Sequence, residues 1–361
     1  MKHLRRQISA LTISCRSIIV PGFVLILLSI AFYSSPSIAA EAKSENETKD
    51  EIGKVEQTAH FAAILKEGDT PNSVAELKAL QRIIQQAAKK IIPCTVGVSV
   101  GPAQGSGVIV SEDGYIMTAG HVIGKSGLDV TITFPDGTKV KGKTLGIDRS
   151  VDTGLIKITK PGKYPFLKID KSSELQEGQW VLVTGHPGGY EKGRKPVLRM
   201  GRVLASYDDV IATDCVLVGG DSGGPLLDLD GDVIGINSRI GSRVSANMFV
   251  PSDLYTSNWE RLKDGDVWGR VPGTPAPYLG VECDLKKKAP VIIRVTPGSP
   301  AERVGIKPGD IITSFNRRAV NTFDDLKMLV NQHSPNDVVS VVVARGSDEL
   351  KFEVTLKRRS R

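Results

Sequence analysis

The spacing of hydrophobic positions along the chain changes near residue 95. Ahead of it, apolar residues recur at helical intervals, at Leu77, Leu80, Ile83, Ile84 and Ala87. Ser73 and Glu76 have the spacing of a capping box, and Pro93 stops a helix. The pattern predicts one amphipathic helix that ends near Lys90. We expect its apolar stripe to dock on the neighbouring domain; a surface for a partner chain is the alternative.

From residue 95 onward the apolar positions alternate, which predicts short β-strands in two groups. The first group is expected at Thr95–Val100, Val108–Ser111, Tyr115–Ala119, Val130–Phe134, Lys139–Leu145 and Gly154–Thr159. The second is expected at Gln179–Thr184, Val197–Ser206, Val210–Leu217, Gly224–Leu227, Val233–Ser238 and Met248–Pro251. Turn signals such as Asp113-Gly114 and Asp230-Gly231 separate the strands. Two such groups predict two small antiparallel barrels, and so a mainly β protein.

The chain changes character again after a predicted closing helix, Ser252–Leu262. Residues 266–277 are rich in Gly and Pro, which predicts a linker. A second, smaller domain is expected over 278–358, with strands and helices at Val291–Val295, Ala301–Val304, Phe323–Asn331, Val338–Ala344 and Leu350–Leu356.

Residues 1–40 have the layout of a signal peptide. Three arginines precede an uncharged run over residues 18–33, and Ser37-Ile38-Ala39 offers small residues for cleavage. The run contains Pro21 and is short for a membrane span. We therefore predict export, with an uncleaved anchor at 18–33 as the alternative. Residues 41–93 are expected to hold a flexible tether followed by the amphipathic helix.

Composition and charge narrow the function further. A 40% hydrophobic and 5% aromatic chain suits a soluble globular protein. Four of the 47 basic residues lie within 1–40, so 43 remain against 40 acidic residues. This small excess, with no basic patch interleaved with aromatics, argues against a nucleic-acid partner.

Cysteine and histidine positions give no metal-site spacing, so neither a metal nor another cofactor is expected. Beyond residue 40 the cysteines are Cys94, Cys215 and Cys283. An odd number in an exported protein leaves at least one free or paired with another chain. Whether Cys94 and Cys215 pair stays open at this point.

One stretch has the composition of a nucleophile turn. Ser222 stands among four glycines in Gly219-Gly220-Asp221-Ser222-Gly223-Gly224. Glycine permits the positive φ angles that expose a hydroxyl and aim backbone N–H groups at a forming oxyanion. A serine also needs a base and a carboxylate, which His121 and Asp152 can supply. The order His, Asp, Ser is that of the chymotrypsin fold, and it places the site between the two barrels.

The sequence resembles the HtrA (Deg) serine proteases over residues 94–358. The match is carried by the Gly105–His121 hairpin, Asn237-Ser238 and Phe249–Asp253. Residues 278–358 resemble a single PDZ domain. The resemblance implies a chymotrypsin-like double-barrel protease domain at 94–265 and a PDZ domain behind the linker.

The resemblance also assigns roles in the site. It makes Ser222 the nucleophile, His121 its base and Asp152 the orienting acid, with the amides of Gly220 and Ser222 as the oxyanion hole. Asp148 is the rival carboxylate and is interpreted as a turn residue. His186 is expected in a surface or loop position.

By position in the family, Leu217 and Ile240 are expected to line the substrate pocket. Both are aliphatic, which predicts cleavage after small or medium aliphatic residues. In the PDZ domain, Leu279, Gly280 and Val281 match the loop that captures a peptide C-terminus, and Leu326 is a candidate wall of that groove.

The implied function is an exported, ATP-independent serine endopeptidase of the periplasm or cell envelope that degrades unfolded or damaged proteins as a homotrimer or higher oligomer. An inactive-protease holdase or scaffold acting through its PDZ domain, and a regulatory protease of one membrane signalling protein, are the alternatives. One departure from the family is Asp221, where HtrA proteases usually carry Asn. Its carboxylate must find another partner, or the loop rests in an inactive shape.

Overall fold

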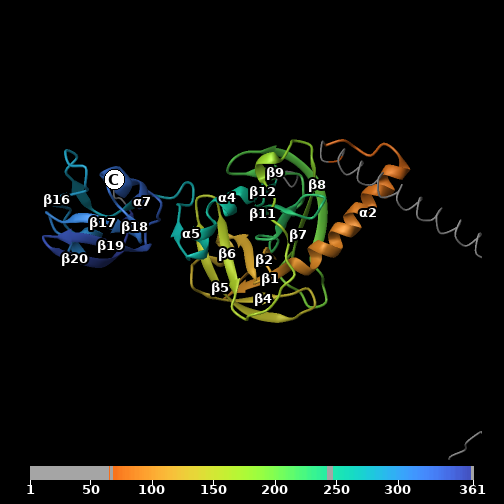
Figure 1. Cartoon of the computed structure of the whole chain (residues 1–361), viewed down its shortest axis with the longest axis horizontal. Helices are drawn as coiled ribbons and strands as arrows, with labels where there is room; N and C mark the ends of the chain where they lie inside the picture. Colours follow the sequence, from red (N-terminus) through yellow and green to blue (C-terminus); the bar gives the residue numbers. More distant parts are fainter. Residues whose placement is uncertain (1–64, 66–67, 242–246, 359–361) are drawn as a thin grey trace, which may run out of the picture. The chain divides into compact units, whose positions relative to one another are not determined.

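The structure is a computed structural model that describes residues 65, 68–241 and 247–358 (Figure 1). The predicted signal peptide 1–40, its alternative anchor 18–33 and the tether up to residue 64 lie outside these residues. Within the described ranges, no helix has the length and apolar character needed to cross a membrane.

Helix α2 spans Val74–Ile91 and is followed by the 3-10 turn Ile92–Cys94, as the apolar spacing predicts. The Ser73 hydroxyl accepts from the N–H of Glu76 at 3.2 Å. The Glu76 carboxylate accepts from the N–H of Asn72, so only half of the predicted capping box forms. The apolar stripe of α2 is buried in one core with strands of the second barrel, which confirms the docking.

The first barrel contains six antiparallel strands and closes through the pairing of β5 with β6. Its strands are β1 (Thr95–Val100), β2 (Ala103–Ile109), β3 (Tyr115–Ala119), β4 (Asp129–Thr133), β5 (Lys139–Asp148) and β6 (Thr153–Ile158). Alternate apolar side chains point inward and fill its core. β2 begins at Ala103 instead of Val108, because glycine and serine give no hydrophobic signal although their backbone pairs with β1.

The second barrel is also closed, in the order β10-β11-β12-β9-β8-β7. Its strands are β7 (Trp180–Gly185), β8 (Val197–Ser206), β9 (Ile211–Thr213), β10 (Pro225–Leu227), β11 (Val233–Arg239) and β12 (Asn247–Pro251). The predicted strand Val210–Leu217 is wrong over its second half, since the ladder ends at Thr213. Cys215 and Leu217 still point into the core, which explains the misleading alternation.

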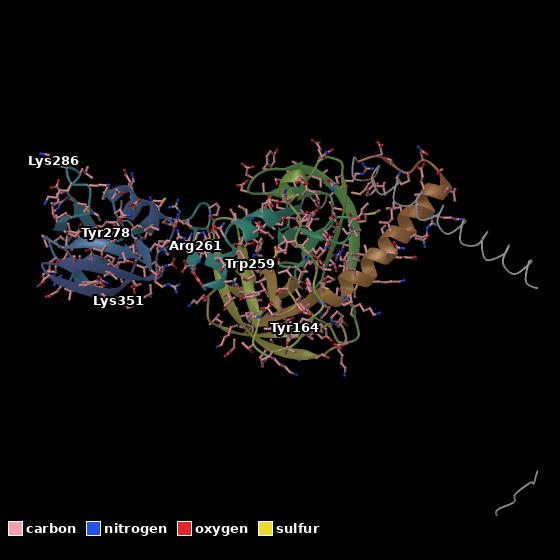
Figure 2. All side chains as sticks on the ribbon, viewed as in Figure 1. Tyr164, Trp259, Arg261, Tyr278, Lys286 and Lys351 are labelled. Carbon is pink, nitrogen blue, oxygen red and sulfur yellow. The ribbon has the colours of Figure 1, made fainter. Side chains whose placement is uncertain are left out.

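The predicted closing helix is broken at Asn258 into α4 (Ser252–Ser257) and α5 (Trp259–Lys263). The Asn258 amide donates to the carbonyl of Leu254 at 3.1 Å, a side-chain bond that competes with helix continuation. Trp259, labelled in Figure 2, packs edge-on against Tyr115 with ring centroids 5.6 Å apart. This contact holds α5 on the first barrel.

The predicted linker 266–277 is structured at its start. Residues Val267–Trp268 form β13, which pairs in parallel with the edge of β5. The Trp268 side chain is buried in the core that also contains α2. Sequence alone favoured a linker here because glycine and proline dominate the segment that follows.

Residues 277–358 form a small domain with its own apolar core. Its strands are β14 (Pro277–Tyr278), β15 (Val281–Cys283), β16 (Ile292–Val295), β17 (Ile311–Phe315), β18 (Arg318–Ala319), β19 (Val338–Arg345), β20 (Asp348–Thr355) and β21 (Lys357–Arg358). Its helices are α6 (Pro300–Arg303) and α7 (Phe323–Asn331). Leu326 of α7, a candidate groove wall, is buried in the core.

Candidate active site

His121 and Asp152 meet at one end of the first barrel. His121 lies in α3 (Gly120–Ile123), directly after β3, and Asp152 lies in the turn before β6. Ala119 of β3 pairs with Thr153 of β6, which brings the two neighbouring residues together. His121 Nδ1 lies 2.8 Å from Asp152 Oδ2, and the His121 backbone N–H donates to Oδ1 at 2.8 Å. Both carboxylate oxygens therefore hold the same histidine.

The environment keeps Asp152 ionised. Burial would raise the pKa of Asp152, but hydrogen bonds and the charge of His121, with a hydrogen bond from Ser238, outweigh it and lower the pKa. An ionised carboxylate only accepts hydrogen bonds, so in the neutral imidazole His121 Nδ1 carries the proton and Nε2 is an acceptor. That tautomer is the one a general base requires.

Ser238 links the second barrel to Asp152. It lies on β11, and its hydroxyl donates to Asp152 Oδ2 at 2.5 Å. The sequence singled out Ser238 only as part of a family segment and gave no sign of this contact. The hydrogen bond ties the Asp152 turn to a strand of the other barrel.

Asp148, the rival carboxylate, has a different role. Its side chain is buried and accepts from the backbone N–H of Ser150 at 2.9 Å and from the Ser150 hydroxyl. These bonds shape the loop that leads to Asp152. Asp148 itself is the last residue of β5 and pairs with Thr153, so the prediction of a turn residue is off by one position, although its side chain holds the turn that follows.

The Ser222 backbone and Val122, the residue after His121, both lie against Gly105 of β2. The Ser222 carbonyl accepts from the N–H of Ser106 on β2 at 2.8 Å. A Cβ atom at Gly105 would meet both the Ser222 carbonyl and the side chain of Val122, the residue after His121, within 2.9 Å. Among the described residues the Ser222 hydroxyl forms no hydrogen bond with His121.

The backbone around Gly220 is arranged by anchored carbonyls. Gly220 has a φ of +94°, which favours glycine, and the carbonyl of Gly219 accepts from the N–H of Gly188 at 2.6 Å. The Asp221 carbonyl accepts from Gly224 N–H at 2.9 Å and from the side chain of Asn237 at 3.0 Å. In a trans peptide the N–H points opposite to the C=O. Both amides of the predicted oxyanion hole, at Gly220 and Ser222, are thus directed away from these anchors.

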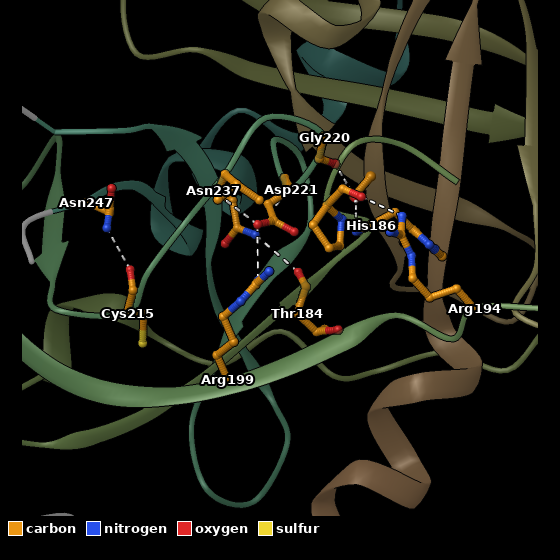
Figure 3. Close-up of polar contacts among 12 residues, drawn as sticks. Thr184, His186, Arg194, Arg199, Cys215, Gly220, Asp221, Asn237 and Asn247 are labelled. Carbon is orange, nitrogen blue, oxygen red and sulfur yellow. Dashed lines mark hydrogen bonds and ion pairs between the residues drawn. The ribbon is translucent and has the colours of Figure 1, made fainter. Parts of the chain in front are cut away.

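His186 is in a loop, as expected, but it is buried and not at the surface. Burial, with a smaller contribution from Arg194, lowers the pKa of His186 to about 4, so its ring is neutral at physiological pH. Its backbone N–H donates to Ser106 Oγ at 2.9 Å, and Ser106 Oγ donates to the carbonyl of Gly220 at 2.8 Å. Figure 3 labels His186 and Gly220. Ser106, which sequence reasoning missed, therefore connects the His186 loop to the Gly220 turn.

The two predicted pocket residues occupy different environments. Leu217 is only 5% exposed and belongs to the core of the second barrel, whereas Ile240, just after β11, is 56% exposed. Val216 and Val218, on either side of Leu217, are both 42% exposed. The pocket roles of Leu217 and Ile240 stay predictions.

The predicted carboxylate loop of the smaller domain lies between β14 and β15. Leu279 is buried, and its carbonyl accepts from the N–H of Ala301 at 3.0 Å. Gly280 has a φ of +92°, and a Cβ atom there would come within 2.2 Å of Ser299. Val281 begins β15. Only glycine fits at this turn.

The described cysteines, Cys94, Cys215 and Cys283, are free and buried. Cys94 and Cys215 do not pair, which answers the question left open by the sequence. Burial raises the pKa of Cys94 to about 12 and that of Cys215 to about 11. These thiols are packing residues and not nucleophiles.

Two closed antiparallel barrels with a histidine–aspartate pair beside a glycine turn define a trypsin-like peptidase domain. The family model of the trypsin-like peptidase domain matches residues 105–236, and that of the PDZ domain matches residues 277–356. The chain belongs to the HtrA (Deg) family of trypsin-like proteases that carry a PDZ domain.

Similar proteins include two named probable periplasmic serine endoprotease DegP-like. The one from Hahella chejuensis is 34% identical over 281 residues, which cover 72% of this chain and 58% of the relative. The one from Marinomonas sp. is 36% identical over 273 residues, 71% of this chain and 57% of the relative. The chain thus spans little more than half the length of these relatives. The solved serine endoprotease from Yersinia pestis has 25% identity over 81% of this chain and all of its own, with a TM-score of 0.47.

Proposed function

We propose that the chain is a serine endopeptidase in which Ser222 attacks the scissile carbonyl, His121 takes its proton and Asp152 stabilises the resulting imidazolium. The observation that carries this proposal is the pair of 2.8 Å contacts between Asp152 and His121, which leaves Nε2 as an acceptor. Support also comes from the amides of Gly220 and Ser222, whose direction is set by anchored carbonyls.

The proposed chemistry requires a direct contact between the nucleophile and its base. Ser222 Oγ must approach His121 Nε2 to within about 3 Å before a proton can pass. The Ser222 carbonyl accepts from the N–H of Ser106, and Asp152 holds the His121 ring, so the approach would come from rotation of the Ser222 side chain or movement of its turn. Catalytic hydrogen bonds of this kind often tighten only when substrate binds.

The proposed substrates are unfolded or damaged proteins, cut without ATP. An extended segment would lie between the barrels, with Leu217 and Ile240 near the residue before the cut. In the PDZ domain, Leu279, Gly280 and Val281 would take up a peptide C-terminus. Two relatives are named periplasmic, and with the predicted signal peptide this favours a site of action in the periplasm or cell envelope. A homotrimer or higher oligomer is the proposed assembly.

Cleavage of β-casein, which lacks stable structure, tests the enzyme proposal. The full chain should cut it without ATP, and Ser222→Ala, purified in the same way, should not. Equal cleavage by both proteins would reject the proposal. If neither cuts and both suppress aggregation of a reduced protein equally, the holdase alternative replaces it.

A peptide-binding measurement tests the PDZ proposal separately. A labelled peptide with a free C-terminus should bind Ser222→Ala, and the same peptide with an amidated C-terminus should bind at least about tenfold more weakly, since it lacks the captured charge. Equal affinity of the two peptides would reject capture of the carboxylate.

A further inference from the structure

Asp221, the residue that departs from the family pattern, lies beneath the Gly220–Ser222 turn and has a cationic neighbour. Its side chain is 1% exposed, and Oδ2 lies 3.1 Å from Nη1 of Arg199 on β8 (Figure 3). The N–H of Val218 also donates to Oδ2 at 3.0 Å. The Arg199 contact is an ion pair and not an aligned hydrogen bond, since Nη1 has no hydrogen-bond partner among the described residues.

The carboxylate is enclosed by backbone. A Cβ atom at Gly185, at the end of β7, would come within 2.8 Å of Asp221 Oδ1 and 2.9 Å of its Cα. Oδ1 has no hydrogen-bond partner within the described residues. Burial raises the pKa of Asp221, and the Val218 N–H and the Arg199 charge counteract the rise. A buried carboxylate with one hydrogen bond depends on a nearby positive charge.

The position of Asp221 couples its side chain to both amides of the proposed oxyanion hole. The Ser222 N–H belongs to the peptide that follows Asp221, so a rotation of the Asp221 backbone turns it directly. The Gly220 N–H belongs to the peptide between Gly219 and Gly220, and it is reached from Asp221 through Gly220, whose carbonyl accepts from Ser106 Oγ at 2.8 Å. Hydrogen bonds to the carbonyls of Gly219 and Asp221 hold the peptides that carry the two amides. The ion pair with Arg199 holds the Asp221 side chain. Without the ion pair, the buried Asp221 carboxylate would move towards solvent, and the Gly220–Ser222 turn would change conformation with it.

We propose that Arg199 is a positioning residue: its charge holds Asp221 under the turn and so keeps the Gly220 and Ser222 amides directed at the developing oxyanion. The proposal rests on the proposed protease function. It also gives Asp221 the partner that the sequence left unassigned. Arg199 touches neither the substrate nor the reacting atoms and acts through Asp221.

The unequal burial of the pair predicts unequal effects. Arg199 is 20% exposed and can reach solvent when its partner is neutral, whereas Asp221 cannot. Arg199→Met should therefore lower kcat by about 100-fold or more, the loss seen when one oxyanion donor is removed. Asp221→Asn should stay within about tenfold of the wild type, because it removes the buried charge itself.

Rescue separates positioning from general stability. The double variant Arg199→Met with Asp221→Asn removes both charges and should recover kcat to within about tenfold of wild type. Arg199→Lys should recover part of it. Arg202→Met is the matched control on the same strand: Arg202 stacks on the ring of Trp180 at 4.1 Å and bonds to the carbonyl of Gly68, away from the turn.

The experiment measures kcat and KM on a peptide substrate with full-length proteins, each checked by circular dichroism for native content. The expected result is a fall in kcat for Arg199→Met with KM within about threefold of wild type, and recovery in the double variant. A folded Arg199→Met that keeps more than about a third of kcat, or a double variant that does not recover, would overturn the proposal.

A crystallographic readout keeps this test distinct from that of the protease function. If wild type and Ser222→Ala are equally inactive, the protease proposal fails. The positioning of the turn is then judged from crystal structures of wild type and Arg199→Met. Loss of the contact between Ser106 Oγ and the Gly220 carbonyl in the variant supports the role of Arg199, and an unchanged turn overturns it.

Discussion

Replacing Asp152 by asparagine changes one atom of the carboxylate and should inactivate the enzyme. The variant is isosteric, so the turn between β5 and β6 should keep its shape. The amide, however, has one oxygen and one NH₂ group where the carboxylate has two acceptors. Which end faces which partner therefore decides the outcome.

The backbone settles that orientation. The His121 N–H donates to Asp152 Oδ1 at 2.8 Å and can only donate, so the amide oxygen must face it. The NH₂ group then faces His121 Nδ1, which lies 2.8 Å from the present Oδ2. Nδ1 must become an acceptor, and the ring proton moves to Nε2. Nε2 can then no longer accept a proton from Ser222.

The expected loss in kcat is about 10⁴-fold, the value measured when the triad aspartate of a trypsin-like enzyme is replaced by asparagine. It corresponds to about 5 kcal/mol of transition-state stabilisation. KM should change little, because Asp152 holds the base and not the substrate.

The assay is steady-state hydrolysis of a fluorogenic peptide, with circular dichroism to establish folding. Asp148→Asn is the matched control: Asp148 bonds to Ser150 and not to His121, so it should retain most of the wild-type kcat. A folded Asp152→Asn protein with more than about a tenth of wild-type kcat would refute the argument from the tautomer. Equal losses in both variants would point to the loop and not to the imidazole.

Three further outcomes concern single contacts. At Gly220, where φ is +94°, a Cβ atom would lie 2.4 Å from neighbouring backbone, so Gly220→Ala should abolish peptide hydrolysis. At Gly219 a Cβ atom would meet nothing within 4 Å, so Gly219→Ala should remain active. Similar rates for the two variants would contradict this. Tyr255→Phe removes a buried 2.6 Å hydrogen bond and should lower the free energy of unfolding by about 1–3 kcal/mol in urea titrations; an unchanged value would exclude a stabilising role. Burial opposes ionisation of Asp310, but its hydrogen bonds with Arg345 at 2.7 and 2.8 Å prevail and lower the pKa of Asp310. The stabilisation from these bonds is therefore present above about pH 4 and is lost as pH falls through the lower pKa of the folded state. Asp310→Asn should make the melting temperature less dependent on pH in this range. An unaltered pH dependence would count against the pair.

Much of the fold could be predicted because local pattern and tertiary structure agree. Alternating apolar residues mark the strands of both barrels, and Ser73 marks the start of α2. The errors occur where local pattern and backbone pairing diverge. β2 extends through glycines that carry no hydrophobic signal, and Asn258 breaks a helix whose apolar spacing continues across it.

Only those site residues that lie in sequence motifs could be predicted. His121, Asp152 and Ser222 stand in recognisable segments, and the first two are in contact as expected. Ser238 and Arg199 act across the chain, and their partners depend on how the barrels close and dock. No local spacing encodes such contacts, so sequence reasoning left Asp221 without a partner and Asp152 without its third hydrogen bond.

The bond from Ser238 to Asp152 has a consequence for the life of a newly made molecule. The first barrel precedes the second along the chain and therefore emerges before it during synthesis. At that stage His121 and Asp152 are present, but their serine and the Ser238 donor are not. In the proposed mechanism such a chain lacks its nucleophile and cannot cut its own unfinished copies, which are unfolded protein and hence the material the mature enzyme is proposed to consume. In the proposed mechanism, dividing the centre between two barrels thus delays hydrolysis until both barrels are complete and the molecule is no longer its own substrate.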